Sequence, residues 1–126
     1  MKIPLLITAI LVALVGPKSA VACSQPSPAD IMNMIEQRVR MPSGAFALNQ
    51  YARFYAESSR PGSVVGVYVR YVDRANKIYT ERRGRRIWLN TYRDLPVVKD
   101  GGCSVVTIIF EPATKRMVSV RCNGEA

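Results

Sequence analysis

A C-terminal hairpin bracketed by two cysteines places the strongest constraint on how this chain can fold. Residues 105–110 form a continuous apolar run, residues 111–114 carry turn chemistry with proline at the second position, and residues 117–122 form a second run. Cys103 precedes the first run, and Cys122 ends the second. The pattern predicts two antiparallel strands joined by a short turn.

The register of this hairpin predicts a disulfide. If Glu111 faces Thr114 across the turn, then Cys103 faces Cys122. Facing Cβ atoms in an antiparallel pair lie about 4.5–5.5 Å apart, which is close to disulfide spacing. The same register pairs Val105 with Val120 and Thr107 with Val118 on the cysteine face, and turns Val106, Ile108 and Phe110 to the other face. We expect a structural Cys103–Cys122 disulfide, because the alternative, a redox-active pair, lacks the C-x-x-C spacing that lowers a thiol pKa.

The first 22 residues resemble a secretory signal. Lys2 gives a positive start, residues 3–15 an apolar run, and residues 20–22 a small-x-small cleavage site. The run is well short of the roughly 20 residues that a membrane-spanning helix needs. We therefore expect residues 1–22 to be a signal peptide, and the protein to be exported to the periplasm or secreted.

Cys23 would be the first residue after cleavage, and two interpretations of it stay open. Residues 20–23 resemble a degenerate lipobox, which makes Cys23 a candidate lipidation site and the protein a candidate outer-membrane lipoprotein. Ordinary cleavage is the alternative, because alanine stands at position 20 where leucine is usual. Lipidation would account for the odd cysteine that a Cys103–Cys122 pair leaves over. Residues 23–28 read as a flexible leader.

The rest of the chain, residues 29–126, predicts a single small α+β domain. A helix capped by Ser27 should carry an apolar stripe of Ile31, Met34, Ile35 and Val39. Strands are expected over residues 50–56, 64–72, 77–81 and 86–89, before the C-terminal hairpin. For residues 46–57 a second helix, lined by Leu48, Tyr51 and Tyr55, stays open as the alternative. The predicted fold is one N-terminal helix followed by an antiparallel β-meander of four to five strands. This element order is similar in layout to cystatin-like domains, but no segment matches the Q-x-V-x-G motif, so the similarity implies no activity.

The charge balance points toward anionic partners. Removing residues 1–22 takes away Lys2 and Lys18, so that 16 of the 18 basic residues remain against nine acidic ones, a net charge of +7. Thirteen of the 16 are arginine, which favours bidentate contact with phosphate or carboxylate. The densest cluster, at the predicted tip of a short hairpin, consists of Lys77, Arg82, Arg83, Arg85 and Arg86. It is a candidate anion-binding site; the alternative is a solvated, solubilising turn.

Several functional classes lose support from the composition. The chain has no histidine, which removes the commonest catalytic base and the commonest metal ligand. We therefore expect no catalytic residues, no metal site and no cofactor.

The predicted function is a small exported basic module of the bacterial cell envelope that contacts an anionic polymer, lipid or other partner. The alternative is an adaptor or inhibitor that docks a protein through its sheet or the 90–102 loop. Nucleic acid is not an expected partner, and membrane contact is expected only through a lipid anchor at Cys23.

Overall fold

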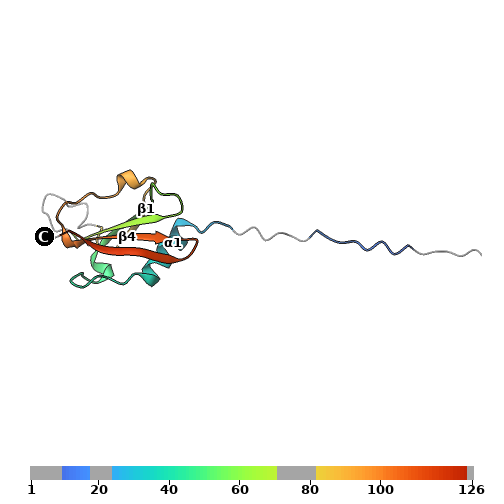
Figure 1. Ribbon diagram of the computed structural model, residues 1–126, viewed down its shortest axis with the longest axis horizontal. Coiled ribbons are helices and arrows are strands. Elements are labelled where there is room, and N and C mark those ends of the chain that lie inside the picture. The colour runs from blue at the N-terminus through green and yellow to red at the C-terminus, as the bar shows by residue number, and fades with distance from the viewer. Residues whose placement is uncertain (1–9, 18–23, 71–81, 125–126) are drawn as a thin grey trace, which may run out of the picture.

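The computed structural model describes residues 10–17, 24–70 and 82–124. The last two of these segments contain one α-helix, which packs against a five-stranded mixed sheet (Figure 1). The strand order in the sheet is β3-β1-β2-β4-β5. The elements are α1 (Pro28–Arg38), η1 (Leu48–Gln50), β1 (Ala52–Glu57), β2 (Val64–Val69), β3 (Arg86–Trp88), η2 (Tyr92–Asp94), β4 (Gly102–Glu111) and β5 (Arg116–Asn123).

The predicted helix is confirmed together with its cap. The Ser27 hydroxyl accepts a hydrogen bond from the Asp30 N–H, and the Asp30 carboxylate accepts one from the Ser27 N–H. Pro28 occupies the first turn, where a missing N–H has no cost. Ile31 and Ile35 of the predicted stripe are buried against the sheet. These bonds also hold the pKa of Asp30 below its usual range.

Four of the five strands pair antiparallel, as predicted, but the fifth does not. The segment expected over residues 50–56 forms β1, which pairs antiparallel with β2. β3 lies on the other side of β1 and runs parallel to it, with Ile87 beside Phe54. The prediction of a purely antiparallel meander is therefore wrong. The strand expected over residues 77–81 lies outside the described residues.

The parallel pairing follows from the placement of β3 beside β1 and not beside β2. β2 ends where β1 begins, because Val69 pairs with Ala52, and β3 starts at the same end of the sheet, because Arg86 pairs with Arg53. β3 therefore runs antiparallel to β2, which precedes it in the chain, and parallel to β1, which lies between them in the sheet. β3 then covers the free edge of β1 and places Ile87 and Trp88 on opposite faces of the sheet, each packed against a different apolar cluster.

The C-terminal hairpin is present, but its turn is wider than predicted. Glu111 faces Arg116 instead of Thr114, because residues 112–115 all belong to the turn. Lys115 takes the left-handed conformation with a φ of 53°, and its N–H closes the turn on the Pro112 carbonyl at 3.2 Å. The predicted register at this end of the hairpin is therefore wrong.

The disulfide is confirmed although the register that predicted it is not. In the observed pairing, Val106, Thr107 and Ile108 of β4 face Cys122, Arg121 and Val120 of β5, respectively. An irregularity between Gly102 and Val106 then shifts the pairing, so that Gly102 faces Asn123. Cys103 lies in this irregular stretch and bonds to Cys122, with 4.5 Å between the Cα atoms. Cys122 consequently shares the sheet face of Val106, contrary to the predicted division of faces.

Both faces of the sheet are covered. One apolar cluster packs α1 onto the sheet, with Ile35, Tyr55, Tyr68, Ile108 and Phe110 among its most buried members. On the opposite face, Phe54 and Val69 belong to a second cluster that is covered by Leu95 and Val98. The 90–102 loop therefore closes the far side of the sheet, and β4 is an interior strand that lies between β2 and β5.

Candidate functional site

Three exposed arginines of the predicted cluster lie in one short turn, residues 82–85, which we call the arginine turn. Its three exposed arginines are Arg82, Arg83 and Arg85. The Gly84 N–H donates to the Tyr51 carbonyl at 3.0 Å, and the Arg53 N–H donates to the Arg85 carbonyl at 2.9 Å. Gly84 has a φ of 77°, in the left-handed region that glycine adopts without strain. The backbone of the turn is thus fixed to the start of β1, while its side chains reach into solvent.

Arg86, the fourth arginine of the predicted cluster, differs in having partners within the protein. Its Nη1 lies 3.6 Å from Glu36 Oε2 and donates to Asn33 Oδ1 at 2.5 Å. Its side chain remains 34% exposed. Arg86 therefore joins the arginine turn to the outer surface of α1, and its charge is partly balanced by Glu36.

Beneath Arg86, Glu36 is the centre of a polar network. Glu36 Oε1 accepts hydrogen bonds from Arg53 Nε and from the Tyr55 hydroxyl, both at 2.9 Å. The Tyr55 and Tyr68 hydroxyls are hydrogen-bonded at 3.0 Å. Arg53 Nη1 also donates to the Leu48 carbonyl at 3.0 Å. The side chains of Arg53 and Glu36 are only 9% and 19% exposed, so each compensates the other's charge in a largely dry environment.

Burial raises the pKa of both Tyr55 and Tyr68 well above the usual range. These tyrosines therefore stay neutral at any physiological pH. Tyr55 acts as a hydrogen-bond donor to Glu36 and not as a general base. The network is suited to positioning Arg53 and Arg86.

The raised pKa of Tyr55 and Tyr68 predicts that the protein unfolds at alkaline pH when these two tyrosines ionise. Because the folded-state pKa of each tyrosine is raised, the stability it contributes is intact below the unfolded value of about 10 and is lost as the pH rises above it. In an ultraviolet titration of the six tyrosines, we expect Tyr55 and Tyr68 to ionise only as the far-ultraviolet circular dichroism is lost. The Tyr55→Phe and Tyr68→Phe variants should each remove part of this late phase. Ionisation of all six tyrosines with the fold intact would contradict the prediction.

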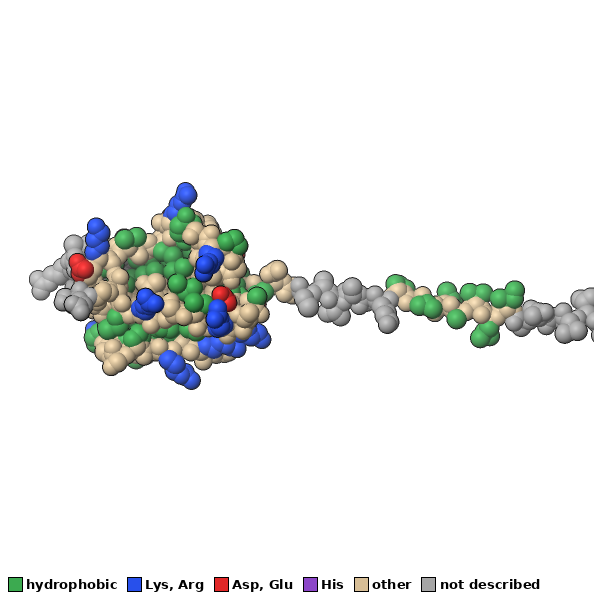
Figure 2. Space-filling model, in the orientation of Figure 1, with side chains coloured by type: hydrophobic (Ala, Val, Ile, Leu, Met, Phe, Trp, Pro, Cys, Tyr) green, Lys and Arg blue, Asp and Glu red, His purple; other side chains and the backbone are tan. Residues whose placement is uncertain are grey.

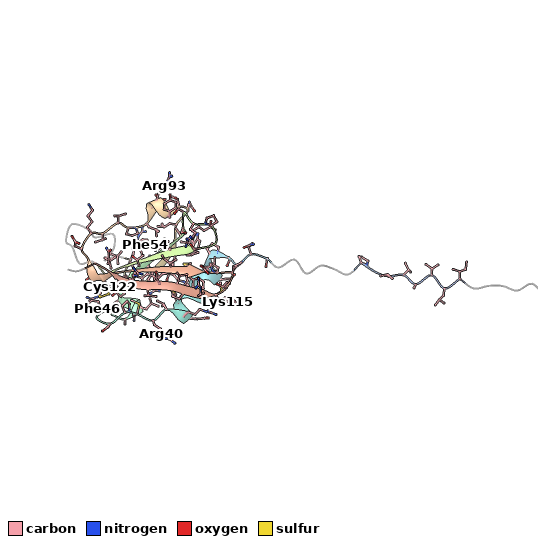
Figure 3. The ribbon with its side chains drawn as sticks, viewed as in Figure 1. Arg40, Phe46, Phe54, Arg93, Lys115 and Cys122 are labelled. Atoms are coloured by element: carbon pink, nitrogen blue, oxygen red, sulfur yellow. A yellow bond between two sulfur atoms is a disulfide. The ribbon has the colours of Figure 1, made fainter. Side chains whose placement is uncertain are left out.

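A further guanidinium lies at the same end of the sheet as the arginine turn. The Arg70 guanidinium carbon is 3.5 Å from the centroid of the Phe46 ring, which is 40% exposed. The Tyr51 hydroxyl accepts from the Phe46 N–H at 3.1 Å and donates to the Cys103 carbonyl at 2.6 Å. Tyr51 thus links this aromatic and basic pair, the disulfide-bearing strand and the arginine turn. Figure 3 shows Phe46 and Cys122 at this end of the domain.

The remaining predicted site residues have different outcomes. Cys103 and Cys122 form the predicted disulfide. Lys77 and Cys23 lie outside the described residues. In the 90–102 loop, Val98 packs on the sheet and its carbonyl accepts from Asn123 Nδ2, while Val97 is 86% exposed.

Glu36 and Arg53 were missed by the sequence analysis. A signal existed for Arg53, because it occupies an alternating strand position shared with Tyr55, facing the helix. Glu36 follows Ile35 of the apolar stripe, where an acidic residue reads as part of the solvent-facing side of a helix. Only the packing of α1 over β1 brings the two side chains together.

The disulfide bears on the setting of the protein. A structural disulfide is typical of proteins that work outside the reducing cytoplasm. In the part of the chain that the structure describes, no helix is long and apolar enough to cross a membrane, and no group of three or more acidic or cysteine side chains could hold a metal ion.

Comparison with known proteins found no matching family model, no matching curated protein and no matching solved structure.

Proposed function

We propose that this protein is a small exported binding module of the cell envelope that contacts an anionic surface or partner through its arginine turn. The observation that carries the proposal is the exposure of Arg82, Arg83 and Arg85 within four residues of a turn that is anchored to β1. None of the ion pairs among the described residues involves these three side chains. The module has no catalytic role in this proposal, and it uses no cofactor.

The physical argument rests on charge density. Three guanidinium groups on neighbouring residues repel one another, and a bound anion with several negative charges relieves that repulsion. Guanidinium groups bind phosphate, sulfate and carboxylate in a bidentate manner and stay charged at any physiological pH. Binding of this kind releases counterions, so its strength should fall steeply with salt concentration.

The test compares two triple variants with the same loss of charge. In the first, Arg82, Arg83 and Arg85 are changed to Gln; in the control, the exposed Arg40, Arg60 and Arg93 are changed to Gln. Heparin serves as the polyanionic probe, and its affinity is measured by calorimetry over a series of salt concentrations. The arginine-turn variant should bind about tenfold or more weakly at low salt, and its slope of log K against log salt should fall by about two to three, since each lost contact removes somewhat less than one unit.

The control variant should retain the heparin affinity of the wild type to within about twofold if the arginine turn is the site. Equal losses in the two variants would mean that heparin responds to net charge alone. That result would overturn the proposal.

The alternative function is an adaptor or inhibitor that docks a protein through its sheet or the 90–102 loop. The exposed Val97 side chain at the surface of that loop is the observation that favours it. A partner captured in this way should be retained by the arginine-turn variant and lost on a Val97→Asp change.

A further inference from the structure

The described domain has two ends that differ in charge. One end, the leader end, is where residues 24–27 join α1, and a groove there is also lined by the β1–β2 and β4–β5 turns, residues 58–63 and 112–115. The other end, the arginine end, contains the arginine turn, Tyr51 and the disulfide. In Figure 1 the leader leaves the domain beside α1, and in Figure 3 Lys115 and Cys122 mark opposite ends of the sheet.

Charges at the leader end are balanced. Its cations are Arg60, Lys115 and Arg116, and its anions are Asp30, Glu57 and Glu111. Arg116 Nη2 lies 3.2 Å from Glu111 Oε1, and this contact holds the pKa of the Glu111 carboxyl below its usual range. This end therefore offers little net attraction to a polyanion.

The arginine end has an excess of positive charge among the described residues. The three exposed arginines of the turn and Arg70 lie there, together with Lys99 and Asp100, which offset each other. On the visible face, Figure 2 shows blue side chains at both ends of the domain and red only in small areas. Among the described residues, the arginine turn and Arg70 therefore give the arginine end, opposite the leader, the greater net positive charge.

We propose that the domain binds an acidic polymer in trans, meaning that its arginine end reaches away from whatever its N-terminal leader is attached to. The inference rests on the proposed function and adds the geometry and the class of ligand. β1 has six residues, so at about 3.3 Å per residue its two ends are roughly 17 Å apart. The four leader residues 24–27 can extend by no more than about 14 Å.

This separation matters because electrostatic attraction is short-ranged in salt. The Debye length is about 8 Å at physiological ionic strength, so an upright domain holds its arginine turn about two Debye lengths from the surface that carries the leader. The arginine turn also lacks the Trp, Phe or Leu side chains that basic membrane-binding segments insert into lipid, since residues 82–85 are Arg, Arg, Gly and Arg. Both points favour a flexible acidic polymer over the headgroups of a bilayer.

The experiment attaches the chain that starts at Cys23 to vesicles by coupling the Cys23 thiol to a maleimide lipid, under conditions that keep the Cys103–Cys122 disulfide intact. Vesicles of phosphatidylcholine are compared with vesicles that also contain phosphatidylglycerol. The affinity for fluorescent heparin is measured for each and for the free protein. If the arginine end faces away from the attachment surface, all three affinities should agree to within about twofold.

Two results would overturn the trans geometry or the class of ligand. A loss of about tenfold or more on vesicles containing phosphatidylglycerol would show that the arginine turn lies on the bilayer of attachment. If free phosphatidylglycerol vesicles displace heparin from protein attached to phosphatidylcholine vesicles, the ligand is a bilayer and not a polymer. Failure of the free protein to bind heparin would instead overturn the proposed function itself, so the two failures are distinguishable.

Discussion

Replacing Glu36 with alanine is expected to lower the free energy of unfolding by about 3 kcal/mol, because it leaves the Arg53 guanidinium largely buried without its counterion. Glu36 Oε1 accepts from both Arg53 and Tyr55 at 2.9 Å, so the substitution also removes the acceptor for a buried hydroxyl. The measurement is urea denaturation followed by circular dichroism. Glu57→Ala is the matched control, because Glu57 is exposed at the end of β1 and its loss should cost less than about 0.5 kcal/mol.

A double-mutant cycle separates the ion pair from simple loss of packing. Glu36→Leu and Arg53→Met are each expected to be destabilising, since each leaves one charge with too few partners. The combination should be less destabilising than the two single effects added together, by about 1–3 kcal/mol, because it removes both charges at once. Additive effects would mean that the two side chains do not depend on each other, and would contradict the role assigned to Glu36.

Removal of the disulfide is expected to have an effect of similar size. The double substitution Cys103→Ser and Cys122→Ser opens a loop with a sequence separation of 19 residues, which is worth about 3 kcal/mol in the chain-entropy model. Denaturant unfolding of this variant and of the wild type, without reductant, gives the difference directly. Cys23→Ser is the control and should leave the midpoint unchanged. A loss below about 1 kcal/mol would show that the irregular pairing of β4 and β5 holds without the crosslink.

The helix and the positions of most strands along the chain could be predicted from local patterns. The cap at Ser27 and the stripe through Ile31 and Ile35 depend only on neighbouring residues, because a helix satisfies its hydrogen bonds within itself. The recurring apolar residues in β2 likewise indicate a strand, and the continuous apolar run in β4 indicates a strand with both faces covered. These predictions needed no knowledge of what lies across the sheet.

The register of the last hairpin could not be predicted in the same way. Thr114 was taken as the partner of Glu111 because the turn chemistry of residues 111–114 was visible, but Glu111 pairs with Arg116, two residues later, across a turn in which Lys115 is in the left-handed conformation. Irregularities between Ile109 and Phe110 and between Gly102 and Val106 then shift the pairing further along the hairpin. The wider turn and these two irregularities together leave Cys103 bonded to Cys122, as the wrong register also had it.

The candidate site likewise has one feature that the sequence predicts and another that only the tertiary structure shows. Composition alone identified the arginine cluster, because a dense run of like charges is a property of the sequence. It could not distinguish Arg86, which is held by Asn33 and Glu36, from the three arginines that remain in solvent. That distinction depends on α1 lying over the edge strand β3.

The sequence by itself therefore determined the capped helix, the apolar strands and the positive charge, all of which follow from the type and spacing of nearby residues. The tertiary structure alone decided the parallel placement of β3, the Glu36 network and the position of the arginine turn opposite the leader. These features join residues far apart in the chain, such as Arg53 and Arg86 with Glu36. Their free energy comes from contacts that exist only after the helix packs on the sheet, so no local pattern encodes them.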